Sequence, residues 1–165
     1  MRIAILLLSI ALAVGANFAA WWLPNRPVAV EGSKVEPPRS VSFSPYRRGQ
    51  SPLTASYATP AEIESDMKLL AAYGVKSLRT YTSLEGIEIV PRLAGAMGLK
   101  VTHSAWLSSR PLANAQEITA LQDAANRYPD TIDRVIVGNE VLLRNDLKID
   151  ELITFIRRVK SSIKQ

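Results

Sequence analysis

Two residue types are scarce in this sequence: cysteine is absent, and histidine occurs once, at His103. A single histidine cannot form a histidine-based metal cluster, and we expect neither a metal nor an organic cofactor. The absence of cysteine is compatible with a compartment outside the cytoplasm. Ser104, Ser108 and Ser109 lack the sequence context of a nucleophile elbow, which disfavours a serine hydrolase.

The body of the chain has little one-sided charge, although the formal net charge is +5. Basic residues near the two ends account for the excess: Arg2, Arg26, Arg157, Arg158, Lys160 and Lys164. A basic stripe on a terminal helix is usually a solvated face, and no aromatic residues are interleaved with these charges. We therefore expect no nucleic-acid partner.

One long apolar run, IAILLLSIALAVGANFAAWWL, occupies residues 3–23 and contains no charged residue. Its roughly 21 residues would cover about 30 Å as a helix, the thickness of a hydrocarbon core. Trp21 and Trp22 close the run where an interfacial aromatic belt would lie. We predict a transmembrane signal-anchor over residues 1–26, in the cell inner membrane, with the rest of the chain on the periplasmic, extracytoplasmic side. A cleaved signal peptide is the alternative, because residues 14–16 would pass as a cleavage site.

Residues 27–40 are rich in proline and charge and lack apolar periodicity, which predicts an extended linker before a domain over residues 41–165. In that domain short apolar runs alternate with amphipathic stretches. Two of the expected helix starts carry a capping-box pattern, Thr59 to Glu62 and Asn114 to Glu117. The expected strands are 41–46, 75–81, 99–107 and 133–139, and the expected helices begin at 60, 87, 114 and 149.

Four strand–helix units in alternation predict an α/β fold with a parallel sheet. A dinucleotide-binding sheet would carry a glycine-rich turn after its first strand, whereas the turn here, SPYRRGQSP, holds one glycine. In a (β/α)8 barrel, functional side chains lie at the C-terminal strand ends. Such side chains lie at the C-terminal end of every expected strand: Tyr46, Arg79, Tyr81, Trp106, Asn139 and Glu140. We therefore predict the N-terminal half of a (β/α)8 TIM barrel, made of four βα units.

Three of these strand ends resemble glycoside hydrolase family 17: LRTY at the second, Trp106 at the third and VGNEVL at the fourth. Within that family the chain is similar, over residues 41–163, to the bacterial membrane-attached branch that works on β-1,3-glucans. The resemblance implies a retaining hydrolase or transglucosylase whose partner is a β-glucan oligo- or polysaccharide. One departure is Thr82, where the family often has an acidic residue.

The resemblance also implies roles for single residues. Glu140 would be the general acid/base, and Asn139 would contact the sugar 2-hydroxyl. Arg79 would help to hold a pair of catalytic carboxylates. Aromatic residues would line the cleft or stack on a sugar: Tyr46, Tyr81 and Trp106.

A retaining glycosidase needs two carboxyl groups about 5 Å apart, one protonated and one ionised. For Glu140 to keep its proton we expect a partly apolar, desolvated position, with Gly138 leaving space beneath it. In family 17 the nucleophile ends strand seven. The acids after Glu140 fall in an expected loop and helix start instead: Asp146, Asp150 and Glu151. We therefore expect a truncated N-terminal half that is inactive alone.

Simpler interpretations stay open at this point. Glu140 could pair structurally with Arg79 or Arg144, and Trp106 could belong to the core. His103 is expected to be a satisfied barrel or interlayer residue. For the whole chain, the alternative to an enzyme is a catalytically inactive, membrane-anchored glycan-binding or scaffold module.

Overall fold

The structure, a computed structural model, describes residues 2–27 and 38–164. The chain divides into two compact units, Met1–Glu36 and Pro37–Gln165. Most of the predicted linker, residues 28–37, lies outside the described residues. Each unit is therefore described by itself.

The first unit is one helix, α1 (Arg2–Asn25), which is long and apolar enough to cross a membrane, with a mean hydropathy of 2.3 over its best window. A signal sequence has the same properties. The few polar side chains are satisfied within the helix: Ser9 Oγ donates to the Ile5 carbonyl at 3.0 Å, and Asn17 Nδ2 donates to the Ala13 carbonyl at 2.9 Å. Such internal hydrogen bonds spare an apolar surrounding the cost of unpaired polar groups.

The second unit contains a parallel sheet of four strands in the order β1-β2-β3-β4. The strands are β1 (Ser40–Ser42), β2 (Ser77–Arg79), β3 (Lys100–Ala105) and β4 (Ile132–Val137). Consecutive strands are neighbours, as the repeated strand–helix pattern predicted. The predicted strands were too long at their C-terminal ends, where the chain leaves the ladder for the loops that carry the candidate site.

The helices of this unit are α2 (Pro60–Ala72), α3 (Val90–Ala96), α4 (Pro111–Arg127) and α5 (Ile149–Ser162), with 3-10 turns η1 (Pro52–Thr54) and η2 (Ile87–Ile89). The predicted capping box at Thr59 is confirmed, since Thr59 Oγ1 accepts from the Glu62 N–H and the Glu62 carboxylate accepts from the Thr59 N–H. The second predicted box is wrong. Helix α4 begins at Pro111, so Asn114 lies inside the helix and its amide binds the backbone of Ser108.

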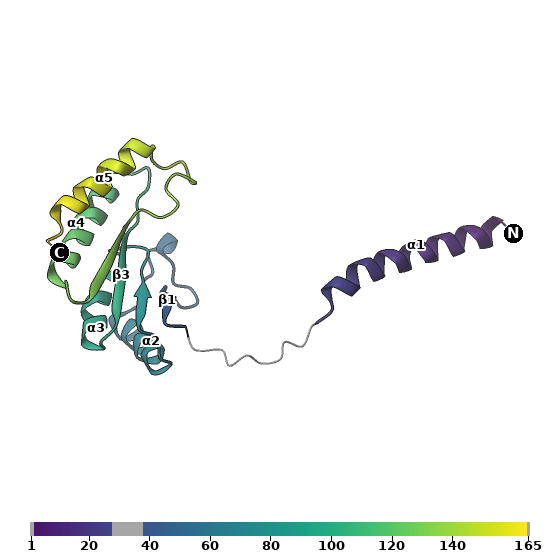
Figure 1. The fold of residues 1–165 in the computed structure, drawn as a ribbon, viewed down its shortest axis with the longest axis horizontal. Helices are drawn as coiled ribbons and strands as arrows, with labels where there is room; N and C mark the ends of the chain where they lie inside the picture. Colours follow the sequence, from purple (N-terminus) through teal and green to yellow (C-terminus); the bar gives the residue numbers. More distant parts are fainter. Residues whose placement is uncertain (1, 28–37, 165) are drawn as a thin grey trace. The chain divides into compact units, whose positions relative to one another are not determined.

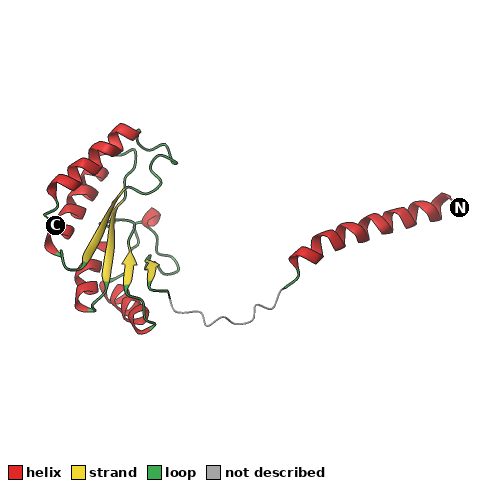
Figure 2. Cartoon of the chain, in the orientation of Figure 1, coloured by secondary structure: helices red, strands yellow, loops and turns green. Residues whose placement is uncertain are grey.

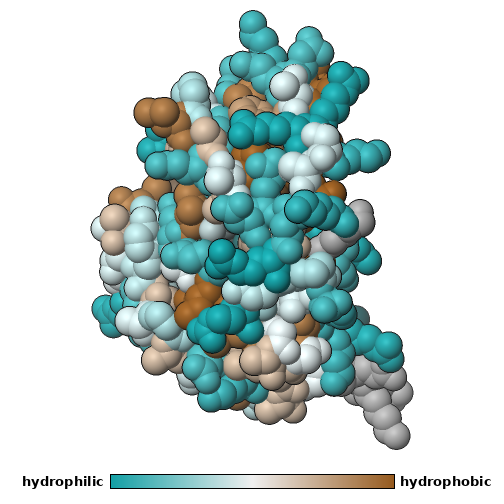
Figure 3. All heavy atoms as spheres, turned by 90° about the vertical axis from the view of Figure 1, so that its left-hand side faces the viewer, coloured by the Kyte–Doolittle hydropathy of each residue, from teal (hydrophilic) through white to brown (hydrophobic). Residues whose placement is uncertain are grey.

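The core lies between the sheet and its helices, and Figure 2 shows α3, α4 and α5 on the same side of the sheet. One buried cluster joins Met67 of α2, Leu78 of β2 and Val101 of β3. A second joins Leu121 of α4 and Val159 of α5 beside Val137. The outer surface of this helical layer is mostly hydrophilic, with apolar side chains scattered over it (Figure 3). The helices therefore face solvent on one side and the sheet on the other.

None of the helices α2 to α5 covers the opposite face of the sheet. Strand register places Ser42, Arg79, Thr102 and Arg134 in one row on this face, where each is exposed or half-buried. Parallel sheets normally have both faces covered, and in a barrel this inner face is enclosed by the remaining strands. The unit is therefore an α/β arc consistent with part of a TIM-barrel-like domain.

His103 on β3 is fully buried on the helix-facing side of the sheet. Its Nδ1 lies 2.9 Å from Thr80 Oγ1, while Nε2 has no partner among the described residues. The sequence predicted a satisfied interlayer histidine, and only one of the two ring nitrogens fits that prediction. Burial lowers the pKa of His103 to about 4, because the charged imidazolium loses its hydration.

We expect the free energy of unfolding to fall as the pH drops from above 6.5 towards 4. Unfolded His103 binds a proton in this range and folded His103 does not, so acid favours the unfolded chain. Chemical denaturation across this range should show a steeper pH dependence for the protein than for His103→Asn, whose amide can still reach Thr80. If the free energy of unfolding depended on pH equally in the protein and in His103→Asn, the lowered pKa of His103 would be contradicted. An NMR titration of the His103 Hε1 proton with a midpoint near pH 6.5 would contradict it as well.

Candidate functional site

The C-terminal ends of the parallel strands meet at one edge of the sheet, and there the structure brings two predicted residues together. Arg79 Nη2, at the end of β2, donates to Asn139 Oδ1, just after β4, at 2.7 Å. The two residues are 60 positions apart in the sequence. Only the parallel register, which aligns strand ends, makes this contact possible.

Arg79 has capacity for a further partner. Its guanidinium carbon lies 4.9 Å from the centroid of the Tyr81 ring, a cation–π contact. Its Nε is buried and has no hydrogen-bond partner among the described residues. The predicted role of Arg79, holding carboxylates, is therefore not what these residues show: Arg79 binds an amide and an aromatic ring, and one buried donor is left over.

Glu140 does not occupy the desolvated position that we expected. Its side chain is exposed and makes no hydrogen bond or ion pair with any described residue, so the structural pairing with Arg79 or Arg144 is wrong as well. Gly138 and Glu140 both have left-handed backbone angles, with φ of 81° and 52°. These angles turn the chain away from the direction of β4. Because β4 is the last strand in the described sheet, no described strand lies beside it on its outer side.

Arg144 holds the loop that carries Asn139 and Glu140. Its Nη1 donates to the Asn139 carbonyl, its Nη2 donates to the Leu107 carbonyl at 2.8 Å, and its Nε pairs with Asp146 Oδ2 at 2.7 Å. Its guanidinium also covers the Trp106 ring, 4.3 Å from the centroid. The planar fork of arginine thus joins the loop after β4 to the loop after β3.

We expected Gly138 to leave free space, but neighbouring side chains fill the space next to its Cα. A Cβ there would lie 2.5 Å from Val141 Cγ2 and 3.4 Å from Leu107 Cδ1. The position therefore needs glycine for two reasons, a φ of 81° and a close approach of side chains.

Gly138→Ala should lower the free energy of unfolding more than Gly49→Ala does. Gly49 has a similar φ of 84°, but a Cβ at this position would meet no atom within 4 Å, so it controls for backbone strain alone. We expect the difference between the two variants, measured by urea denaturation, to be about 1–3 kcal/mol from overpacking. If both variants lost the same free energy of unfolding, the Val141 side chain would have moved aside without an energetic cost.

A cavity of about 440 Å³ lies beside this edge, between the loops that follow β1, β2 and β3. Three predicted residues line it: Tyr46, Tyr81 and Trp106. Arg79, Asn139 and Glu140 are not among its lining residues. The predicted site is thus divided into an aromatic cavity and a strand-end ledge made of Arg79, Asn139 and Glu140. The contact of Arg79 with the Tyr81 ring joins the two.

Two further residues of the cavity carry charge, and the sequence reasoning missed both. Glu85 and Arg110 line it together with Tyr46. Burial raises the pKa of Glu85, and the nearby Arg110 opposes that rise. Burial, followed by the charge of Glu85, raises the pKa of Tyr46 to about 12, so this phenol keeps its proton and can donate it in a hydrogen bond.

Glu117 was also missed, because its spacing from Asn114 resembled a helix cap. It is 6% exposed and accepts from the Ser83 N–H at 2.9 Å, from the Trp106 N–H at 3.1 Å and from Thr82 Oγ1. Burial raises its pKa, while these hydrogen bonds oppose the rise. Glu117 thereby ties the loops after β2 and β3 to α4, and Thr82 serves this contact at the position where family 17 often has an acid. Pro111 was the signal that could have revealed the true start of the helix.

Within residues 2–27 and 38–164, no group of three or more metal-ligating side chains of His, Cys, Asp or Glu gathers at one place. The expectation that no cofactor takes part stays a prediction.

Residues 40–165 match the BtgE/BtgC glycoside hydrolase domain, and the chain belongs to that family. Two curated relatives, each described as a probable beta-glucosidase btgE, come from Aspergillus flavus and Aspergillus oryzae. Each is 28% identical over 138 residues, which cover 82% of this chain and 21% of the relative's length.

A solved structure shows a similar fold. It is an active-site mutant of Rhizomucor miehei beta-1,3-glucanosyltransferase in complex with laminaritriose, with a TM-score of 0.60 and 25% sequence identity. The match covers 74% of this chain and 44% of that chain. The chain therefore spans less than half of the length of these proteins.

Proposed function

We propose that residues 41–165 are the acid/base-bearing part of a family 17 retaining hydrolase or transglucosylase that acts on β-1,3-glucan. The observation that supports this proposal is the Arg79–Asn139 hydrogen bond, which orients the Asn139 amide just after the C-terminal end of β4, next to Glu140 in the sequence. Catalytic groups of (β/α) barrels lie at this end of the strands. The family match and the similarity to a glucanosyltransferase with bound laminaritriose support the choice of substrate.

The hydrogen bond to Arg79 orients the Asn139 amide. Because Oδ1 accepts from Arg79, the Nδ2 group points its two donors away from that contact. We place the sugar hydroxyl next to the scissile bond at these donors. Binding of glucan over the ledge would also cover Glu140, which we propose as the acid that protonates the leaving oxygen in the first step.

The second carboxylate of a retaining mechanism must come from outside the four described strands. In family 17 it ends strand seven, and the enclosed face of a barrel would bring that strand towards Arg79. The buried, unpartnered Arg79 Nε is a donor that an ionised nucleophile could use. By itself, the present set of residues would bind glucan without cleaving it.

We further propose that α1 anchors the protein in the inner membrane, with the glycosidase domain on the extracytoplasmic side. The length and apolarity of α1 support this placement. The exposed, unpaired Glu140 favours the second candidate function, a membrane-anchored glycan-binding or scaffold module, which needs no acid/base.

In a protein that also supplies the strand-seven carboxylate, Glu140→Gln should slow hydrolysis of laminari-oligosaccharides by about 10²–10⁴-fold, the usual contribution of a general acid. Binding should be unchanged. The hydrolysis rate of Glu140→Gln should fall less for substrates with an activated aryl leaving group, because such a group leaves without being protonated. Azide should restore turnover of these substrates, because it attacks the glycosyl-enzyme without help from a base. The reaction is followed by chromatography of the released sugars.

Asp133→Asn is the matched control, because it removes an exposed carboxylate at the opposite end of the same strand, β4. Full activity of Glu140→Gln would contradict the acid/base role. Glucan binding by a protein that has both carboxylates but never cleaves would favour the binding module.

A further inference from the structure

Glu85 is a partly buried carboxylate whose negative charge is left without a partner. It lines the cavity of about 440 Å³, and burial raises its pKa. Yet its side chain forms no hydrogen bond or ion pair with any described residue. Arg110, on the same cavity, is near enough to oppose the rise in pKa but makes no ion pair with Glu85. The cavity thus holds separated acceptor and donor groups with space between them.

The backbone holds Glu85 in this position at a cost. Its φ of 63° is left-handed, which is uncommon for a residue with a side chain, and Gly86 follows with a φ of 85°. A Cβ at Gly86 would lie 3.4 Å from the Ala58 carbonyl, so this turn packs closely against the loop between β1 and α2. Strain of this kind persists where the surroundings force it, and it concentrates at functional sites.

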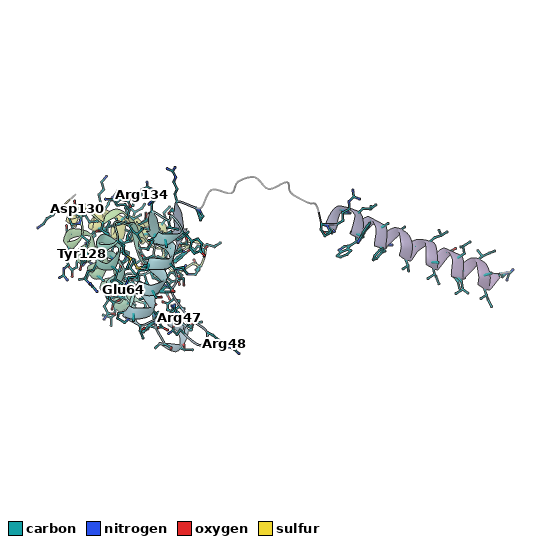
Figure 4. The ribbon with its side chains drawn as sticks, turned by 90° about the horizontal axis from the view of Figure 1, so that it is seen from below. Arg47, Arg48, Glu64, Tyr128, Asp130 and Arg134 are labelled. Atoms are coloured by element: carbon teal, nitrogen blue, oxygen red, sulfur yellow. The ribbon has the colours of Figure 1, made fainter. Side chains whose placement is uncertain are left out.

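The opposite wall of the cavity is also fixed. Arg47 anchors the loop between β1 and α2 through two hydrogen bonds to Asp66, at 2.6 and 2.8 Å, and one to the Pro45 carbonyl at 2.8 Å. Figure 4 labels Arg47 and its neighbour Arg48, whose side chain reaches outwards. The same loop contributes Tyr46 and Leu53 to the cavity. The cavity is therefore formed before any ligand binds.

Trp106 is one of the residues that line this cavity. Arg144 covers its ring at 4.3 Å, so a sugar can stack only on the other face. Trp106 is 37% exposed, and Arg110 lines the same cavity. An aromatic platform with an acceptor and a donor at its rim suits a neutral hexose, whose ring stacks and whose hydroxyls need both kinds of partner.

From this arrangement we propose that Glu85 is a specificity-determining residue that accepts hydrogen bonds from the hydroxyls of a neutral glucosyl unit stacked on Trp106, with Arg110 as the donor across the unit. The carboxylate also repels sugars that carry a carboxylate of their own. This proposal rests on the proposed function, because it concerns the same glucan.

Binding of laminaritriose tests the proposal, followed by tryptophan fluorescence, with Trp106→Phe to identify the signal. Glu85→Ala should weaken binding about 10- to 100-fold, the range for losing hydrogen bonds to a charged acceptor. Glu85→Gln should weaken it less and should raise the melting temperature, because a desolvated, unpaired charge is removed. A structural role would lower both affinity and stability. Asp133→Asn, which removes an exposed carboxylate that does not line the cavity, is the control.

The preference for neutral over acidic sugars is tested with laminaritriose whose primary hydroxyls have been oxidised to carboxylates. It should bind the protein at least about 10-fold more weakly than laminaritriose, and Glu85→Gln should narrow this gap. Equal binding of both sugars, or unchanged affinity in Glu85→Ala, would overturn the role of Glu85 alone. No binding of laminaritriose at all would overturn the proposed function together with it. These outcomes are separate from the hydrolysis test of Glu140, because Glu140→Gln is expected to leave binding intact.

Discussion

The hydrogen bond between Arg79 and Asn139 is the contact on which the candidate site of this domain depends. It joins the ends of β2 and β4, with β3 between them, and so it requires that the three strands be parallel and in register. If this register shifted by one residue, Arg79 would turn to the helix-facing side of the sheet, into the core. The same bond orients the Asn139 amide next to Glu140. The alignment of the strands therefore determines how this amide is placed in the site.

Two further charged side chains fix the loops around that bond. Glu117 of α4 binds the loops after β2 and β3, and Arg144 joins the loop after β3 to the loop after β4. Both contact Trp106, Glu117 through the backbone N–H and Arg144 through the ring. Each hydrogen bond to a charged group contributes roughly 1.5–3 kcal/mol, which makes these loops well suited to hold an aromatic platform. By contrast Glu140 is held only through its backbone.

Sequence reasoning predicted the parallel order of the strands and the start of α2 correctly, because both depend on local patterns. It also brought Arg79 and Asn139 to the same edge, since strand ends align in any parallel sheet. It placed the start of α4 wrongly and thereby missed Glu117, whose partners lie 11 to 35 positions away in the sequence. It also expected Glu140 to be buried, although burial there depends on neighbours beyond β4. Contacts made across loops have no short-range pattern to reveal them.

We propose that glucan binds at the C-terminal edge of the sheet, over the cavity and the ledge. The most direct measurement is a titration of the ¹⁵N-labelled protein with laminaritriose, observed by NMR. We expect shifts of the Trp106 indole, the Asn139 side-chain amide and the Arg79 Nε–H, with Gly74 and Gly98 at the other end of the strands unaffected. Shifts confined to Gly74 and Gly98, or no shift at any of these groups, would contradict the claim.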